Sequence, residues 1–132
     1  MKIARAKEEQ PHTMPAPFDR TITIMMAPDR HDVPEIMLSH VIIPPGSGTD
    51  YHAHDRPELI YVAQGKGVAR CEGEEIDLEP DLAMWILEGE MHEVRNTGDE
   101  DIKLMTVFVP GYSAEESYQA FAERARENAE GK

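Results

Sequence analysis

The chain has 132 residues, enough for one domain with a buried core but too few for two. Acidic residues outnumber basic ones by 26 to 13, and the formal net charge of -13 disfavours nucleic acids and anionic membrane surfaces as partners. No run approaches the roughly 20 apolar residues that span a bilayer, and the first ten residues do not resemble a secretory signal. The single cysteine, Cys71, excludes an internal disulfide, and we expect a cytoplasmic protein.

The first 19 residues are polar and rich in proline, which predicts an N-terminal arm (1–19) rather than a packed element. Beyond them, short β-branched and aromatic runs alternate with turns rich in Gly, Pro and Asp. The predicted strands are Thr21–Met25, Ile36–Ile43, Glu58–Gln64, Val68–Cys71, Glu75–Leu78, Ala83–Leu87, Met91–Asn96 and Ile102–Val109. Short strands at fairly even spacing indicate an all-β sandwich or barrel, here over residues 20–112.

The end of the chain, residues 113–132, changes character. Ser113–Ala129 has no Gly or Pro and opens with a capping box, Ser113 followed three residues later by Glu116, so it predicts a helix. One face of this helix is expected to pack on the β-structure, because its apolar residues recur at helical spacing. These residues are Tyr118, Phe121, Ala122 and Ala125.

The most informative segment is the one that contains His52, His54 and Glu58. Residues two apart in an extended segment project to the same face, so His52 and His54 can enter one space together. Imidazole nitrogen suits Fe, Mn, Co, Ni, Cu and Zn, and a carboxylate adds an anionic ligand. His92, at the start of another predicted strand, can complete the set in three dimensions. Taken alone, a His-x-His pair also occurs by coincidence or on a surface.

These residues resemble the motifs of the cupin superfamily. Gly46, His52, His54, Glu58 and Gly65 match every fixed position of the first cupin motif. The spacing that leads from this motif to the second resembles that of compact, single-domain bacterial cupins.

The second motif is matched less completely. Gly89, His92 and Asn96 keep their positions, whereas Asp81 stands in place of a glycine and Leu87 in place of a proline. Both departures concern turn geometry rather than metal ligands.

The resemblance implies an all-β fold, a cupin jelly-roll (double-stranded β-helix) barrel, to which the predicted C-terminal α-helix adds. It also implies one divalent transition metal (Fe, Mn, Zn, Ni or Co) on His52, His54, Glu58 and His92, with coordination positions left open for water or substrate.

No catalytic acid or base is fixed by spacing. His40, Tyr61 and Arg56 are weak candidates: His40 as a general base or a group behind the ligands, Tyr61 as an acid or base, and Arg56 as a guide for an anion. Their alternative interpretations are ordinary strand and loop residues. Arg95 is expected on the outer face if His92 and Val94 point inward.

Two classes of function remain open. The first is a metal-dependent enzyme (dioxygenase, lyase or decarboxylase, or isomerase) acting on a small oxygen-rich carboxylate, carbonyl or sugar-like molecule. The second is a non-catalytic module that binds or senses a small ligand. A vestigial barrel is disfavoured because all four ligand positions are filled. The resemblance implies a homodimer, and apolar strand faces such as residues 36–43, which need cover, favour one as well.

Overall fold

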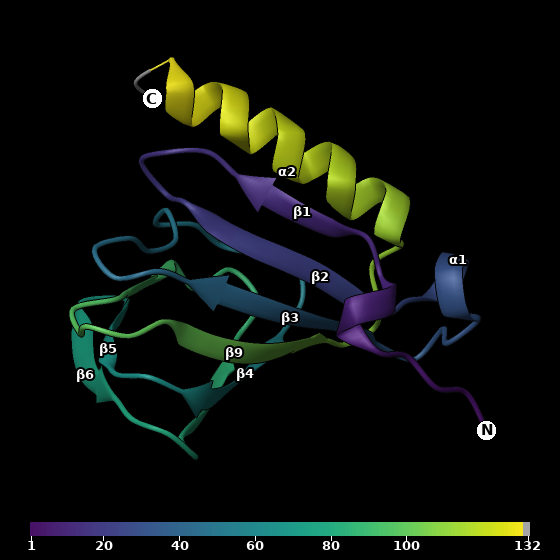
Figure 1. Cartoon of the computed structure of the whole chain (residues 1–132), viewed down its shortest axis with the longest axis horizontal. Helices are drawn as coiled ribbons and strands as arrows, with labels where there is room; N and C mark the ends of the chain where they lie inside the picture. The colour runs from purple at the N-terminus through teal and green to yellow at the C-terminus, as the bar shows by residue number, and fades with distance from the viewer. Residues whose placement is uncertain (131–132) are drawn as a thin grey trace.

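The computed structural model describes residues 1–130, and these residues form nine strands in two sheets. The larger sheet has the order β1-β2-β3-β9-β4-β7, and the smaller sheet has the order β6-β5-β8. The strands of the larger sheet are β1 (Pro11–Met14), β2 (Arg20–Met26), β3 (Met37–Ile43), β9 (Ile102–Phe108), β4 (Glu58–Gln64) and β7 (Ala83–Ile86). Those of the smaller sheet are β6 (Glu74–Leu78), β5 (Gly67–Cys71) and β8 (His92–Arg95). Figure 1 shows this arrangement from one side.

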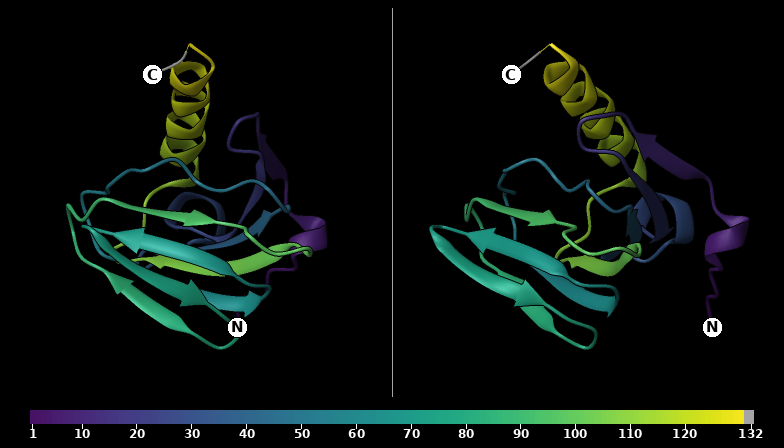
Figure 2. Two further views of the ribbon diagram at one scale, coloured as in Figure 1. Left: turned by 90° about the vertical axis from the view of Figure 1, so that its left-hand side faces the viewer. Right: turned by 60° about the vertical axis from the view of Figure 1, so that its left-hand side comes forward.

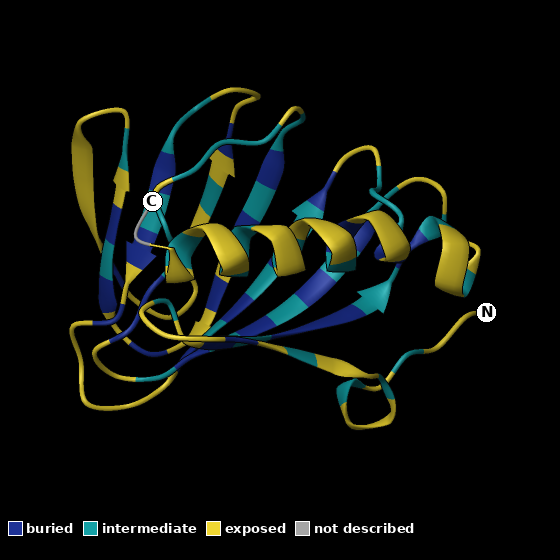
Figure 3. Cartoon of the chain, turned by 90° about the horizontal axis from the view of Figure 1, so that it is seen from above, coloured by how far each residue is buried: buried dark blue, intermediate teal, exposed yellow. Residues whose placement is uncertain are grey.

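The helices lie outside the sheets. They are the short η1 (Ala6–Glu8) and α1 (Pro28–His31) and the long C-terminal α2 (Ala114–Ala129). Figure 2 shows the sheets as two layers with α2 standing above them, and Figure 3 shows α2 crossing over the strands. None of the helices within residues 1–130 has the length and apolar character needed to cross a membrane.

Alternation along the strands builds the core between the sheets. In β3 and β9, every second residue from Met37 and from Ile102 is buried, as period-2 packing of one face requires. The two strands are paired antiparallel from Met37 with Phe108 to Ile43 with Ile102. The inner faces supply the largest cluster of buried apolar side chains, which includes Ile43, Val62 and Ile102.

All eight predicted strands are present, and no end differs from its prediction by more than one residue. The ninth, β1, lies inside the segment predicted as an unpacked arm. It pairs with β2 from Pro11 opposite Thr23 to Met14 opposite Arg20, and Met14 is 1% exposed. The interpretation of the whole arm as unpacked was therefore wrong for residues 11–14. The division of the chain into 1–19, 20–112 and 113–132 stays a prediction, and residues 131–132 lie outside the described part.

The predicted jelly-roll is confirmed as two facing sheets rather than one closed sheet. In the described residues no strand pairing closes the larger sheet onto the smaller one. The C-terminal helix is also confirmed, with Ser113 as its N-cap: Ser113 Oγ accepts a hydrogen bond from Glu116 N at 3.0 Å. Ala122, expected on the packed face, is exposed, and Ser117 is buried there instead.

Candidate metal centre

The segment before β4 places two histidines opposite each other. Residues 46–52 run antiparallel beside β8, with isolated bridges that pair Gly48 with Arg95 and His52 with His92. His52 N donates to His92 O at 3.0 Å, and His92 N donates to His52 O at 2.8 Å. Directly paired residues project their side chains to the same face, and the two imidazole centroids are 4.6 Å apart.

Gly48 makes this close approach possible. A Cβ atom at Gly48 would lie 2.4 Å from the carbonyl oxygen of Val94, a distance at which the backbone of β8 would have to move. Glycine is therefore required where the segment crosses β8. The same contact brings His52 to within reach of His92.

Glu58 enters the site from the larger sheet. It is the first residue of β4, where it pairs with Phe108 on one side and with Ile86 on the other. Its side chain faces the interior together with Ile60, and Glu58 is 6% exposed. Backbone pairing on both sides thus fixes the position of the carboxylate.

Four potential ligand atoms converge between the sheets. His52 Nε2 lies 3.0 Å from His54 Nε2, and Glu58 Oε1 lies 3.2 Å from His92 Nε2 and 3.6 Å from His54 Nε2. The three imidazoles each offer a nitrogen within 4.8 Å of the others. His92 is 4% exposed, so the cluster is inside the molecule rather than on its surface.

The outer nitrogens of two rings are already engaged by the backbone. His52 Nδ1 lies 2.6 Å from Asp50 O, and His92 Nδ1 lies 2.9 Å from Glu90 O. A carbonyl oxygen only accepts, so each Nδ1 carries the proton and each Nε2 of a neutral ring is a free acceptor. This is the tautomer in which a histidine binds a metal through Nε2.

Burial controls the charge of these rings. Burial is the largest cause that lowers the pKa of His52, to about 4, and the positive charge of Arg124 is the next. Burial is also the largest cause that lowers the pKa of His54, to about 2. Burial acts in the same direction on His92, but the adjacent Glu58 carboxylate and the Glu90 carbonyl outweigh it and raise the pKa of His92. His52 and His54 are therefore neutral at pH 7 and available as ligands.

The donor set fits a metal ion. Among the described residues Glu58 Oε1 is buried without a hydrogen-bond partner, although His92 Nε2 lies close to it. Three imidazole nitrogens and a carboxylate oxygen this close together can bind one cation, and such a cation would satisfy Glu58 Oε1. Ligand atoms about 2.1 Å from one ion lie roughly 3.0–3.5 Å apart, and the observed separations are close to this range.

A cavity of about 80 Å³ adjoins the four side chains. It has room for several waters or for a ligand of a few non-hydrogen atoms. Apolar walls come from both sheets, with Ile60, Leu104 and Phe108 on the larger sheet and Val94 on the smaller one. Phe108 also meets the ring of His54 edge-on, with centroids 4.7 Å apart, and so helps to fix the orientation of that ring.

Three charged residues that sequence reasoning missed also lie at the site. Arg20, at the start of β2, and Arg124, on α2, both line the cavity. Each faces Asp50: Arg20 Nη2 is 3.6 Å from Asp50 Oδ1, and Arg124 Nε is 3.5 Å from Asp50 Oδ2. The sequence held one signal for Arg124: it follows Phe121 by three residues and so shares the packed face of the helix. Nothing in the sequence pointed to Arg20.

The weak catalytic candidates lie elsewhere. His40 and Tyr61 alternate with inward-facing neighbours on β3 and β4, so they occupy the outer face of the larger sheet. Tyr61 donates a hydrogen bond to Asp81 there. Arg56 stacks on Tyr112, with 3.7 Å between the guanidinium carbon and the ring centroid, and does not line the cavity. None of the three is brought to the histidines.

Both departures from the second motif have local compensation. Asp81 adopts a φ of +71°, the left-handed region that glycine favours and that Asp tolerates better than most residues. Leu87 uses the backbone N–H that a proline would lack, donating it to Glu90 Oε1 at 2.7 Å. The two turns therefore form without the expected residues. As predicted, Arg95 is exposed while Val94 faces inward.

The family model described as "Cupin domain" matches residues 39–108, slightly more than half of the chain. The Oxalate-binding protein of Thermotoga maritima is 27% identical over 74 residues, 55% of this chain and 61% of the relative. The tetracenomycin polyketide synthase protein TcmJ of Streptomyces glaucescens is 30% identical over 74 residues, 55% of this chain and 50% of the relative. The match thus spans less than two thirds of these relatives' own length.

Solved structures agree on the fold. The crystal structure of a predicted oxalate decarboxylase from Thermotoga maritima superposes with a TM-score of 0.74 at 20% identity, over 82% of this chain and 98% of the other. KdgF from Halomonas sp. superposes with a TM-score of 0.69 at 23% identity, over 82% and 94% of the two chains. At these identities the likeness establishes the fold alone. Together with the family match, it shows that the chain belongs to the cupin family.

Proposed function

We propose that the protein is a metal-dependent enzyme that acts on a small oxygen-rich molecule, and that His52, His54, Glu58 and His92 hold one divalent transition metal. The observation that carries this proposal is the convergence of three imidazole nitrogens on a buried carboxylate oxygen that has no hydrogen-bond partner among the described residues. Such a metal would supply Lewis-acid polarisation of a bound carbonyl or carboxylate oxygen, or redox chemistry if it is iron.

The residues of the chain would prepare the site for this chemistry. The backbone carbonyls of Asp50 and Glu90 hold the two Nδ1 protons and so fix the ring orientations of His52 and His92. Ile60 and Phe108 exclude water from one side of the cavity, which strengthens electrostatic interactions within it. The cavity admits only a small ligand.

Metal content tests the proposal most directly. Protein purified without added ions should contain close to one transition metal per chain, and His52→Ala and His92→Ala should each lose most of it while the β-structure remains. His40→Ala is the matched control, because it removes a histidine on the outer face of the larger sheet, away from the site. Full metal retention after loss of both His52 and His92 would refute the metal centre. Iron rather than zinc or manganese would indicate oxygen chemistry.

A second candidate is a module that binds a small ligand without converting it. One relative is named Oxalate-binding protein, which supports this alternative. Incubation of the metal-loaded protein with candidate carboxylates, followed by mass spectrometry, separates the two functions. An enzyme converts the ligand, whereas a binding module returns it unchanged.

We also propose a cytoplasmic homodimer, but one that does not associate through the strand at residues 36–43. The strand expected to need cover, β3, lies between β2 and β9, so its edges are already paired. Instead, the outer face of the larger sheet carries apolar side chains, with Trp85 on the edge strand β7 53% exposed. A self-association surface there would cover that edge. Sedimentation velocity at micromolar concentration tests the proposal, and a monomer alone would contradict it.

A further inference from the structure

Two arginines that enter the metal cavity come from outside the matched cupin region. The match covers residues 39–108, which include all four proposed ligands, whereas Arg20 and Arg124 lie beyond its two ends. Arg20 is 4% exposed, and burial lowers its pKa to about 10 despite the nearby Asp50, so it remains charged at pH 7. Burying a guanidinium is unfavourable unless the charge is paired, which suggests that Arg20 has a role at this site.

The arginines have more hydrogen-bond donors than the protein uses. Within residues 1–130, the side chain of Arg124 makes no hydrogen bond, and its one ion pair is the 3.5 Å contact with Asp50. Arg20 donates to Phe18 O at 3.0 Å and lies 3.6 Å from Asp50. A guanidinium carries five N–H donors, and most of those on Arg124 remain free for a ligand. Figure 1 shows α2, which carries Arg124, lying above β1 and β2.

A third polar group of the cavity, Ser39, has no hydrogen-bond partner among the described residues. Ser39 is 2% exposed and its hydroxyl oxygen makes no hydrogen bond within the described residues. Ser39 lines the same cavity as Arg124. Buried hydroxyls are normally hydrogen-bonded, so a ligand with oxygen acceptors would complete this site.

The charges of the cavity also favour an anion. The guanidiniums of Arg20 and Arg124 balance the carboxylates of Asp50 and Glu58, so a divalent metal would leave two positive charges uncompensated. Buried charge that is not compensated is strongly unfavourable. We propose that Arg124, backed by Arg20, forms a carboxylate-binding subsite beside the metal, and that the ligand is a small carboxylate whose second oxygen-bearing end reaches the metal. The second contact rests on the proposed metal centre.

The subsite also borders a second cavity that lies nearer the helix α2. An outer cavity of about 280 Å³ lies between α2 and residues 53–55, and Arg124, Phe121 and His54 line both this space and the inner cavity. A ligand in the outer cavity therefore lies beside Arg124 and His54 at the same time. The guanidinium can attract a carboxylate there and then hold it within the cavity.

Calorimetric titration of the zinc-loaded protein with malonate tests the subsite, with the uncharged malonamide as comparator. We expect malonate to bind at least tenfold more tightly than malonamide. Arg124→Gln should weaken malonate binding by about 10- to 100-fold, as expected for the loss of a hydrogen bond to a charged group. Malonamide binding should stay unchanged, and Arg124→Lys should recover part of the loss. Arg126→Gln, an exposed position two residues along α2, is the matched control.

The outcomes separate the subsite from the metal centre. If Arg124→Gln retains zinc and binds malonate as the wild type does, the subsite is refuted while the metal centre stands. The same holds if the zinc-loaded wild type does not prefer malonate to malonamide, a result that needs no folded variant. If the wild type does not hold zinc, the metal centre fails, and the titration is run on metal-free protein. If the metal-free wild type and the metal-free Arg124→Gln variant bind malonate with equal affinity, the subsite is refuted.

Discussion

His92 differs from the other two histidines in its response to protons. Its pKa is raised because Glu58 and the Glu90 carbonyl favour the charged ring, whereas burial lowers the pKa of His52 and His54. A lowered histidine pKa stabilises the fold above the unfolded value near 6.5, and that contribution is lost as the pH falls. A raised histidine pKa has the opposite effect: its contribution to stability is complete below pH 6.5 and is lost as the pH rises through the folded-state pKa.

Acidification should therefore destabilise the metal-free protein. The two lowered pKa values, about 4 and about 2, outweigh the one raised value, so the free energy of unfolding should fall by about 1 kcal/mol or more per pH unit between pH 6.5 and 4.5. Urea denaturation across this range measures the slope. His54→Gln removes one of the two groups and should give a shallower slope. Identical slopes for the variant and the wild type would contradict the assignment.

Asn96 belongs to the second cupin motif, and its side chain hydrogen-bonds backbone groups of neighbouring segments rather than pointing at the histidines. Its amide nitrogen donates to Ile43 O and to Glu100 O, both at 2.9 Å, and its oxygen accepts from Gly98 N at 3.0 Å. Asn96→Ala should lower the free energy of unfolding by about 2–3 kcal/mol, because it leaves buried backbone groups unpaired. The exposed Asp99→Ala in the same turn is the control. A change below about 0.5 kcal/mol for Asn96→Ala would show that water replaces the amide.

At the residue scale, local alternation predicted the inward side chains of the candidate site. His52 and His54, and then Glu58 and Ile60, share faces because strand geometry repeats every two residues. Arg20 and Arg124 escaped prediction because they reach the cavity through the packing of β2 and α2, which no short-range pattern encodes. Charged residues on strands and helices usually face solvent, so their burial becomes visible only in three dimensions.

Among the secondary-structure elements, turn signals predicted eight strands well because Gly, Pro and Asp punctuate the chain at nearly every strand end. The strand β1 was missed for the opposite reason, since its surroundings carry the prolines typical of an arm. Pro11 is tolerated as the first residue of an edge strand, where its missing N–H breaks no ladder. His12 on β1 then contacts Tyr118 and Phe121 of α2, which covers this edge.

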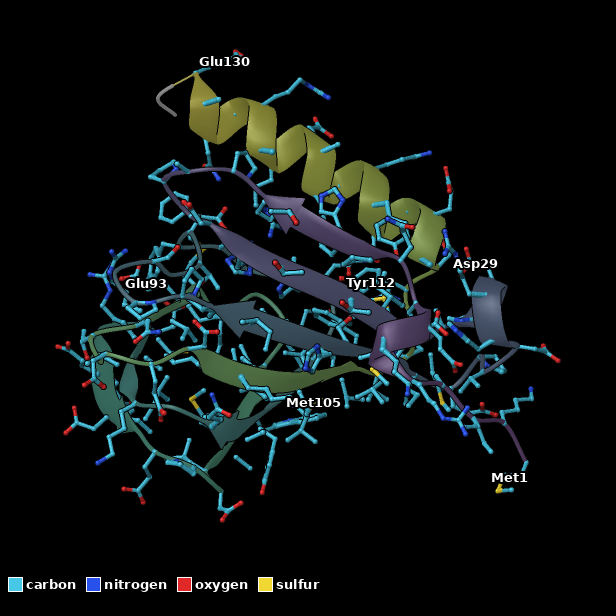
Figure 4. All side chains as sticks on the ribbon, viewed as in Figure 1. Met1, Asp29, Glu93, Met105, Tyr112 and Glu130 are labelled. Atoms are coloured by element: carbon cyan, nitrogen blue, oxygen red, sulfur yellow. The ribbon has the colours of Figure 1, made fainter. Side chains whose placement is uncertain are left out.

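The start of α2 is anchored by a residue that lies far away in the sequence. Asp29 of α1 accepts hydrogen bonds from Ala114 N at 2.6 Å and from Glu115 N at 3.1 Å, which adds to the cap made by Ser113. Figure 4 labels Asp29 between α1 and the first turn of α2. A carboxylate at this helix end satisfies free N–H groups and favours the helix dipole.

Asp29→Ala should therefore loosen α2. The expected cost is about 1 kcal/mol of stability, with faster amide exchange in the first turns of the helix. Because α2 carries Arg124, carboxylate binding should weaken as well. Asp32→Asn is the control: this side chain is 95% exposed, Asn tolerates the left-handed backbone at φ +55°, and neither exchange nor binding should change. Unchanged exchange in Asp29→Ala would mean that Ser113 alone is sufficient as the cap.

At the scale of the whole molecule, the candidate metal centre joins the two layers. Glu58 belongs to the larger sheet and His92 to the smaller one, while His52 and His54 lie on the segment that connects β3 with β4. Among the described residues Glu58 Oε1 is buried without a hydrogen-bond partner, and the Nε2 atoms of His52 and His54 lie 3.0 Å apart. A cation bound by all four side chains would link the two sheets.

Metal should therefore stabilise the entire fold and not only the loop that carries two ligands. At a free metal concentration 100-fold above Kd, the gain is about 2.7 kcal/mol, which corresponds to a rise in melting temperature of roughly 10 °C for a domain of this size. Calorimetry of the metal-free and metal-loaded protein measures the rise, and a chelator should reverse it. His92→Ala should abolish the rise, whereas His40→Ala should preserve it. An equal rise in His92→Ala would place the bound metal elsewhere, because removal of the one ligand from the smaller sheet would then leave the stabilisation intact.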